Sequence, residues 1–155
     1  GPPSPYLIVD TLLEARKIAA FTSGKLAWLS QYLAKTEKDS HKEFPGFSLW
    51  KECLGGNSRA WTAMKKYNPQ DVISTEDVYI KLRPWMKNHP NMGGFLDTEK
   101  PVCDKCGSDH LQSRGTRVMK SGFTYRQFQC MACGGWMRGR STEMSLKKRR
   151  SLLTS

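Results

Sequence analysis

Long apolar stretches are missing from this chain of 155 residues, and no secretory leader is recognisable in it. No run of hydrophobic residues is long enough to span a membrane, so we expect a cytoplasmic protein without a membrane partner. Histidine is scarce as well, with three residues, all in loop-like sequence. None of them supports a catalytic role for a cysteine nucleophile. Cys53 falls on the apolar side of a predicted helix over 47–54 and is therefore expected to be a buried core thiol.

Acidic residues are rare in the last part of the chain. Residues 101–155 hold 11 Lys/Arg and 3 Asp/Glu, whereas residues 1–100 hold 14 and 11. The basic side chains alternate with aromatic ones, a mixture typical of surfaces that neutralise phosphates and stack bases. The alternative is a solvated basic face whose aromatic residues form a small core. The candidate residues for binding DNA or RNA are Arg114, Arg117, Lys120, Tyr125, Arg126, Trp136, Arg138 and Arg140.

Four of the five cysteines stand in two C-x-x-C pairs, and glycine follows each pair. Four thiolates suit a structural Zn²⁺ site, because a C-x-x-C turn brings two sulfurs to the same ion. The glycine lets the backbone fold back under the metal at positive φ. Two disulfides or four unrelated thiols are the alternatives, but disulfide frameworks are typical of secreted chains. The predicted zinc ligands are Cys103, Cys106, Cys130 and Cys133.

The residues between the two cysteine pairs predict a β-hairpin. Segments 116–120 and 123–128 have strand-like sequence, and Ser121-Gly122 between them is a turn signal. A hairpin carries one cysteine pair back to the other, which is the arrangement of a zinc ribbon.

The first hundred residues predict a strand followed by helices. A short apolar run at 6–10 favours the strand. Either Asp10 or Thr11 can cap the helix that follows. If Thr11 is the cap, Glu14 completes a capping box with it. Asn68-Pro-Gln is expected to separate the last two helices. Helical spacing covers 11–20, 24–34, 47–54, 58–67 and 72–86.

Tyr67 and Asp71 stand four positions apart at the predicted start of the last helix, so their side chains project the same way. A carboxylate near a basic surface is a candidate Mg²⁺ ligand, and a tyrosine hydroxyl beside it can orient a water or a phosphate oxygen. The alternative is an aspartate that caps the helix beside a packed tyrosine.

The run 67–82 resembles the third motif, Y-x-x-x-D, of the DEDD 3′–5′ exonucleases of the tyrosine subtype, which have the ribonuclease-H-like fold. The chain as a whole resembles the C-terminal portion of phage-encoded exonucleases of this superfamily, which end in a zinc ribbon. Matching features appear in order along nearly the whole chain: Pro2-Pro-Ser-Pro-Tyr6 before Val9-Asp-Thr-Leu12, Phe21-Thr-Ser-Gly-Lys-Leu26, Leu82-Arg-Pro-Trp85 with His89-Pro-Asn91, and Cys103-x-x-Cys106-Gly-Ser108.

The resemblance implies that Asp71 is a ligand of a catalytic Mg²⁺ or Mn²⁺ and that Tyr67 positions the attacking water. The family's remaining carboxylates, a D-x-E pair and a second-motif aspartate, belong to the N-terminal half of the domain. Asp97-Thr-Glu99 spells D-x-E but lies in a linker, and we do not assign it to the site. Asp10 is a further candidate metal ligand, with a helix cap as its alternative. A polypeptide that supplies the missing half is therefore an expected partner. Without it, we expect the strand at 7–9 to lack its sheet neighbours and some apolar helix faces to be exposed.

We expect an α/β fold with a C-terminal, mostly helical part of a ribonuclease-H-like exonuclease domain over 1–87. A linker at 88–100, a small β zinc ribbon at 101–141 and a basic tail at 142–155 follow. The expected function is the C-terminal part of a metal-dependent 3′–5′ exonuclease acting on DNA or RNA, inactive as this chain alone and located in the host cytoplasm if phage-encoded. The alternative is a non-catalytic zinc-ribbon module that binds nucleic acid or a replication or transcription protein. A fragment, half of a split enzyme and a remnant that lost catalysis all fit the sequence.

Overall fold

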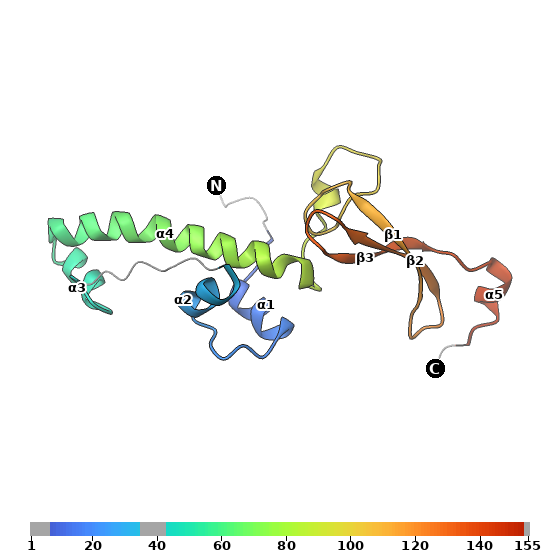
Figure 1. Ribbon diagram of the computed structural model, residues 1–155, viewed down its shortest axis with the longest axis horizontal. Helices are drawn as coiled ribbons and strands as arrows, with labels where there is room; N and C mark the ends of the chain where they lie inside the picture. Colours follow the sequence, from blue (N-terminus) through green and yellow to red (C-terminus); the bar gives the residue numbers. More distant parts are fainter. Residues whose placement is uncertain (1–6, 35–42, 154–155) are drawn as a thin grey trace, which may run out of the picture. The chain divides into compact units, whose positions relative to one another are not determined.

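The computed structural model describes residues 7–34 and 43–153, which divide into two compact units: a helical unit, Ile8–Leu82, and a ribbon unit that begins at Arg83. The helical unit contains no strand among its described residues, and the ribbon unit holds a three-stranded antiparallel sheet. The fold is therefore mixed α/β, as expected (Figure 1). None of the described helices is both long and apolar enough to cross a membrane.

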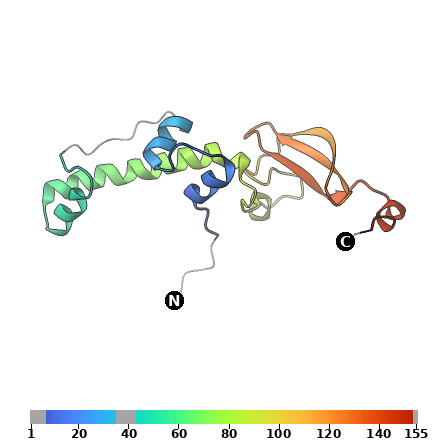
Figure 2. The same ribbon diagram turned by 90° about the horizontal axis from the view of Figure 1, so that it is seen from below.

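One long helix, α4, organises the helical unit. Figures 1 and 2 show α3 beside the first turns of α4, and α1 and α2 beside its other half. The elements of this unit are α1 (Thr11–Ile18), α2 (Leu26–Leu29), the π-helical turn η1 (Ser30–Ala34), α3 (Ser48–Leu54) and α4 (Ser58–Leu82).

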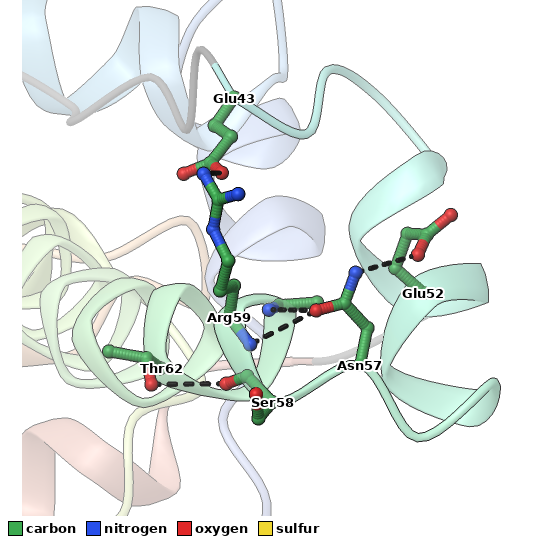
Figure 3. A network of polar contacts seen from close by, with 7 residues as sticks. Glu43, Glu52, Asn57, Ser58, Arg59 and Thr62 are labelled. Atoms are coloured by element: carbon green, nitrogen blue, oxygen red, sulfur yellow. Dashed lines mark hydrogen bonds and ion pairs between the residues drawn. The ribbon is translucent and has the colours of Figure 1, made fainter.

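Asn57 fixes the start of α4. Its side-chain Oδ1 accepts hydrogen bonds from the backbone N–H groups of Arg59 at 3.0 Å and Ala60 at 3.3 Å, which have no partner within the helix. The amide Nδ2 of Asn57 donates to Glu52 of α3 at 2.9 Å, and Arg59 pairs with Glu43 (Figure 3). The cap therefore also ties α3 to α4.

The expected break at Asn68-Pro-Gln does not occur, because α4 continues through Pro69 as one helix of 25 residues. A proline inside a helix removes one backbone hydrogen bond and costs about 3 kcal/mol. Both halves of α4 are nevertheless packed, the first against α3 and the second against α1, α2 and η1. Most of the stability of a helix in a protein comes from its tertiary packing. In α4 the packing on both sides of Pro69 outweighs the local cost of the proline.

The buried core of the helical unit lies along one side of α4. Leu49 and Cys53 of α3 pack with Ala60, and Phe44, Ala63, Met64 and Tyr67 cover this cluster. Cys53 is 6% exposed, which confirms the prediction of a core thiol. Around the second half of α4, where α1, α2 and η1 pack, the buried residues are Ala15, Leu29, Ser30, Ser74, Val78 and Leu82.

Leu49→Ala tests this core. Leu49 is fully buried, so we expect its truncation to leave a cavity and lower the free energy of unfolding of the helical unit by about 2–5 kcal/mol. Leu54 in the same helix is 86% exposed, and Leu54→Ala is expected to change stability by no more than about 0.5 kcal/mol. Urea unfolding followed by circular dichroism measures both. Equal losses in the two variants would contradict the packing of α3 on α4.

The first described residues of the chain correct two expectations. Residues 7–10 do not form a strand, and Leu7 and Ile8 are 70% and 77% exposed, because no neighbouring strand offers them backbone hydrogen bonds. Asp10 caps α1, with its carboxylate accepting from the backbone N–H of Leu13 at 2.9 Å. Glu14 does not complete a capping box with Thr11; it is buried and pairs with Lys17 at 2.6 Å.

The ribbon unit contains a sheet with strand order β1-β2-β3. The predicted hairpin is present: β1 and β2 pair antiparallel, and Gly122 donates its backbone N–H to the carbonyl of Met119 in the turn. The third strand was not predicted, and the segment expected as a linker contains a short 3₁₀ helix, η3. The elements are η2 (Arg83–Trp85), η3 (Met92–Phe95), β1 (Leu111–Val118), β2 (Thr124–Cys130), β3 (Trp136–Thr142) and α5 (Leu146–Arg150).

Candidate metal centre and basic sheet face

The four cysteines predicted as metal ligands come together at one end of the sheet. Their sulfur atoms all lie within 4.8 Å of one another, with 3.7 Å between Cys103 and Cys133 and 3.6 Å between Cys106 and Cys130. All five cysteines of the chain are free thiols, so the alternative of two disulfides is not realised. This cluster can hold a metal ion such as zinc, and the described residues contain no other group of three or more His, Cys, Asp or Glu so placed.

Two knuckles of nearly identical backbone geometry hold the sulfurs. In the first, Gly107 donates its N–H to the carbonyl of Cys103 at 2.9 Å and has φ +78°. In the second, Gly134 donates to the carbonyl of Cys130 at 2.9 Å and has φ +79°. In each knuckle a backbone N–H, that of Lys105 or Gly135, also points at a sulfur at 3.4 Å. The predicted role of the glycines at positive φ is confirmed.

Replacing these glycines is expected to separate backbone strain from crowding. Gly134→Ala meets no atom within 4 Å and should cost only the positive-φ penalty, about 1–2 kcal/mol. Gly107→Ala pays the same penalty and also places a methyl group 2.9 Å from Leu96 Cδ1, which must then move. We expect the lower urea midpoint for Gly107→Ala. A midpoint no lower than that of Gly134→Ala would contradict the packing of Leu96 on the first knuckle.

The thiols of the cluster differ in acidity. Burial raises the pKa of the Cys103 thiol strongly and that of Cys133 to a smaller extent. Burial also acts to raise the pKa of Cys130, but hydrogen bonds from the backbone of Cys133 and Ala132 and from the thiols of Cys106 and Cys133 together outweigh it and lower this pKa to about 7. A metal ion that binds here must displace protons from Cys103 and Cys133, so its affinity depends on pH.

Two features of the metal centre were missed by sequence reasoning. Lys105 lies inside the first knuckle and is only 5% exposed, with its ammonium 3.4 Å from the carboxylate of Asp104. Its position between the two cysteines of the knuckle was the available signal for this burial. The backbone N–H of Met92 in η3 donates to the carbonyl of Asp104 at 2.9 Å, so η3 supports the knuckle instead of serving as a free linker.

The register of the sheet places most candidate nucleic-acid residues on one side. Residues directly opposite each other in antiparallel strands share a face. Arg117 is opposite Tyr125, and Arg138 and Trp136 are opposite Gln127 and Gln129. Gln127 and Gln129 are two and four positions after Tyr125 in β2, so their side chains share its face. Arg114 joins them, because its guanidinium donates to Gln129 Oε1 at 2.8 and 3.1 Å. We name this surface the arginine face: Arg114, Arg117, Tyr125, Gln127, Gln129, Trp136 and Arg138.

Arg126 lies on the opposite side of the sheet. It follows Tyr125 directly in β2, and its Nε is 3.4 Å from the carboxylate of Glu143. Of the remaining candidates, Lys120 is exposed in the turn between β1 and β2. Arg140 is exposed in the part of β3 where the register with β2 shifts. The structure therefore brings five of the eight candidates onto one face and separates the other three.

Tyr67 and Asp71 lie one turn apart inside α4, and both are half-buried. They are not at a helix start, so Asp71 is not a helix cap. The ring of Tyr67 packs edge-on against Trp50 at a centroid distance of 5.9 Å. Buried Ser74 and Val78 follow Asp71 at helical spacing, which puts all four residues on the side of α4 that faces the core.

No protein-family model, curated protein or solved structure matches this chain. The functional proposal therefore depends on the metal centre, the arginine face and the Tyr67–Asp71 pair.

Proposed function

We propose that this chain is the C-terminal part of a metal-dependent 3′–5′ exonuclease acting on DNA or RNA. The observation that carries the proposal is the placement of Tyr67 and Asp71 one turn apart on an uninterrupted helix, both half-buried. That placement suits the Y-x-x-x-D motif, in which a tyrosine and an aspartate must reach the same catalytic centre.

Asp71 suits one position in a Mg²⁺ or Mn²⁺ site, because these ions prefer carboxylate oxygens. A pair of such ions activates a water and stabilises the leaving oxygen in phosphodiester cleavage. In the proposal Asp71 holds one ion and the Tyr67 hydroxyl orients the water. The other carboxylates come from the first and second motifs, on an upstream or separate polypeptide. Asp10 serves α1 as a cap, and a metal-binding role for it stays a prediction.

Exposed apolar side chains support a missing partner for the helical unit. Trp61, Val72 and Ile73 of α4 are 48%, 62% and 50% exposed. In the proposal these positions pack against the rest of a ribonuclease-H-like domain, whose sheet would bury them. This is the exposure expected of a fragment or of half of a split enzyme.

We also propose that the four cysteines hold one structural Zn²⁺. A tetrahedral site with Zn–S distances of about 2.3 Å has sulfur–sulfur edges of about 3.8 Å. The separations of 3.6 Å between Cys106 and Cys130 and 3.7 Å between Cys103 and Cys133 fit that edge length. In the proposal the zinc takes no part in catalysis. It fixes the two knuckles and thereby the strands that follow them.

A second candidate function is a non-catalytic zinc-ribbon module that binds nucleic acid or a replication or transcription protein. The arginine face favours it, since three arginines and an exposed tryptophan share one surface. The two functions differ at Asp71, which matters for cleavage only in the first.

A nuclease assay on end-labelled single- and double-stranded DNA with Mg²⁺ or Mn²⁺ tests the proposal. We expect stepwise loss of 3′ nucleotides when the chain is combined with the polypeptide that carries the first two motifs, and none with the chain alone. Absence of cleavage in the combined protein would favour the binding module. Cleavage by the chain alone would contradict the assignment of the other carboxylates to a partner.

A further inference from the structure

The arginine face carries no acidic side chain. Residues 101–155 contain only three carboxylates, Asp104, Asp109 and Glu143. Asp104 pairs with Lys105 in the first knuckle, and Glu143 pairs with Arg126 on the opposite side of the sheet. Asp109 lies before β1, outside the strands. Among the residues that the structure describes, Arg126 forms an ion pair with a carboxylate, whereas Arg114, Arg117 and Arg138 form none.

Two of the three arginines are held in place. The guanidinium carbon of Arg138 lies over the Tyr125 ring, 4.0 Å from its centroid. This cation–π contact restrains the position of the guanidinium. Arg114 is held by its two hydrogen bonds to Gln129. A guanidinium that is already ordered loses less conformational entropy when it binds a phosphate.

Trp136 lies on the same face, and the backbone from which its side chain projects is held by the second cysteine knuckle. It is 48% exposed, and it directly follows Gly135, whose carbonyl accepts from the backbone N–H of Cys130 at 2.8 Å. The second cysteine knuckle therefore fixes the start of β3. An exposed aromatic ring beside ordered arginines is the arrangement on which proteins stack unpaired bases while neutralising the adjacent phosphates.

We propose that the arginine face binds single-stranded nucleic acid, with an unpaired base stacked on Trp136 and phosphates contacted by Arg114, Arg117 and Arg138. The inference rests on the proposed nucleic-acid function and narrows its substrate to unpaired strands. In a duplex the base faces are already stacked on one another, so Trp136 gains no base contact there. Arg126, on the other side and paired with Glu143, takes no part in binding.

Matched substitutions test the inference in the full chain. Fluorescence anisotropy with a labelled thymidine oligonucleotide and with a hairpin duplex gives the two affinities. We expect tighter binding of the single strand. Trp136→Ala should weaken it by about tenfold or more, the usual effect of losing one stacking contact. Phe47→Ala, at an aromatic residue of the helical unit that is 66% exposed, should leave the affinity unchanged.

Arg138→Gln and Arg126→Gln remove one positive charge each, from opposite faces. Arg138→Gln should weaken single-strand binding and reduce the slope of log affinity against log salt by about 0.7, the value for one phosphate contact. Arg126→Gln should change neither. Metal content and circular dichroism, measured for every variant, show that the ribbon is folded.

The outcomes separate the inference from the function on which it depends. Equal affinity for duplex and single strand overturns the single-strand assignment. Equal losses for Arg126→Gln and Arg138→Gln overturn the assignment of binding to the arginine face. Both results leave nucleic-acid binding in place. Failure of the parent chain to bind either nucleic acid overturns the inference together with the nucleic-acid-binding form of the module, and leaves only a module that binds a protein. Cleavage by the completed enzyme is measured separately and is independent of both results.

Discussion

Cys103→Ser is expected to abolish metal binding and to unfold the ribbon sheet while the helical unit remains folded. A structural zinc site contributes about 10–16 kcal/mol, comparable with the whole stability of a domain, about 5–15 kcal/mol. The described strands have few buried side chains besides the cysteines, since β1 and β3 contain none that is fully buried. The helical unit has its own buried core around Leu49 and Val78.

Elemental analysis and hydrogen exchange measure this effect. We expect one zinc per parent chain and none in Cys103→Ser, with loss of amide protection in β1, β2 and β3 only. The matched control is Cys53→Ala, which removes the cysteine outside the cluster and should retain the metal. A Cys103→Ser protein with a full zinc complement and a protected sheet would show that these thiols do not hold the ribbon together.

Asp71→Asn is expected to reduce cleavage by the completed exonuclease by at least about 10³-fold. A neutral amide is a much weaker ligand for Mg²⁺ or Mn²⁺, and losing several kcal/mol of transition-state stabilisation has this effect on rate. Asn is nearly isosteric with Asp, so α4 should keep its fold. Zinc content and nucleic-acid affinity are expected to match those of the parent.

Glu76→Gln is the control for this substitution. Glu76 is an exposed carboxylate on the same helix, and its neutralisation should leave the cleavage rate within about twofold, as expected for a surface position away from the site. Both variants are measured by single-turnover cleavage of a 3′-labelled strand. Equal rates for Asp71→Asn and the parent enzyme would remove Asp71 from the catalytic centre.

The four-cysteine cluster was predictable from the sequence because its geometry is local. A C-x-x-C-G segment fixes the turn, the sulfur positions and the need for positive φ within five residues, so both knuckles match the expectation. The start of α1 at Asp10 was predictable for the same reason, since a cap depends on adjacent residues.

Features that depend on distant contacts were predicted less well. Pro69 reads as a helix break, yet the packing of α4 on α3 and on α1 keeps the helix continuous. The run at 7–10 has strand-like residues, but a strand needs a paired neighbour. The alternation of Trp136 and Arg138 with Met137 and Gly139 was the signal for the unpredicted β3.

The composition of the arginine face depends on a bulge. Arg114 and Arg117 are three positions apart, so in a regular strand they would point to opposite faces. The register of β1 against β2 shifts between Ser113 and Thr116, where Gly115 has φ +77°. One extra residue in β1 brings both arginines to the same side. Counting basic residues identified the candidates, but only the pairing of the strands divides them into two faces.

The most direct test of the account is a Mn²⁺ titration of the completed nuclease domain, followed by electron paramagnetic resonance, for the parent and Asp71→Asn proteins. The account predicts two bound ions in the parent and the loss, or at least tenfold weakening, of one of them in the variant. Identical binding curves for the two proteins would contradict the claim that this chain contributes a metal ligand to an exonuclease.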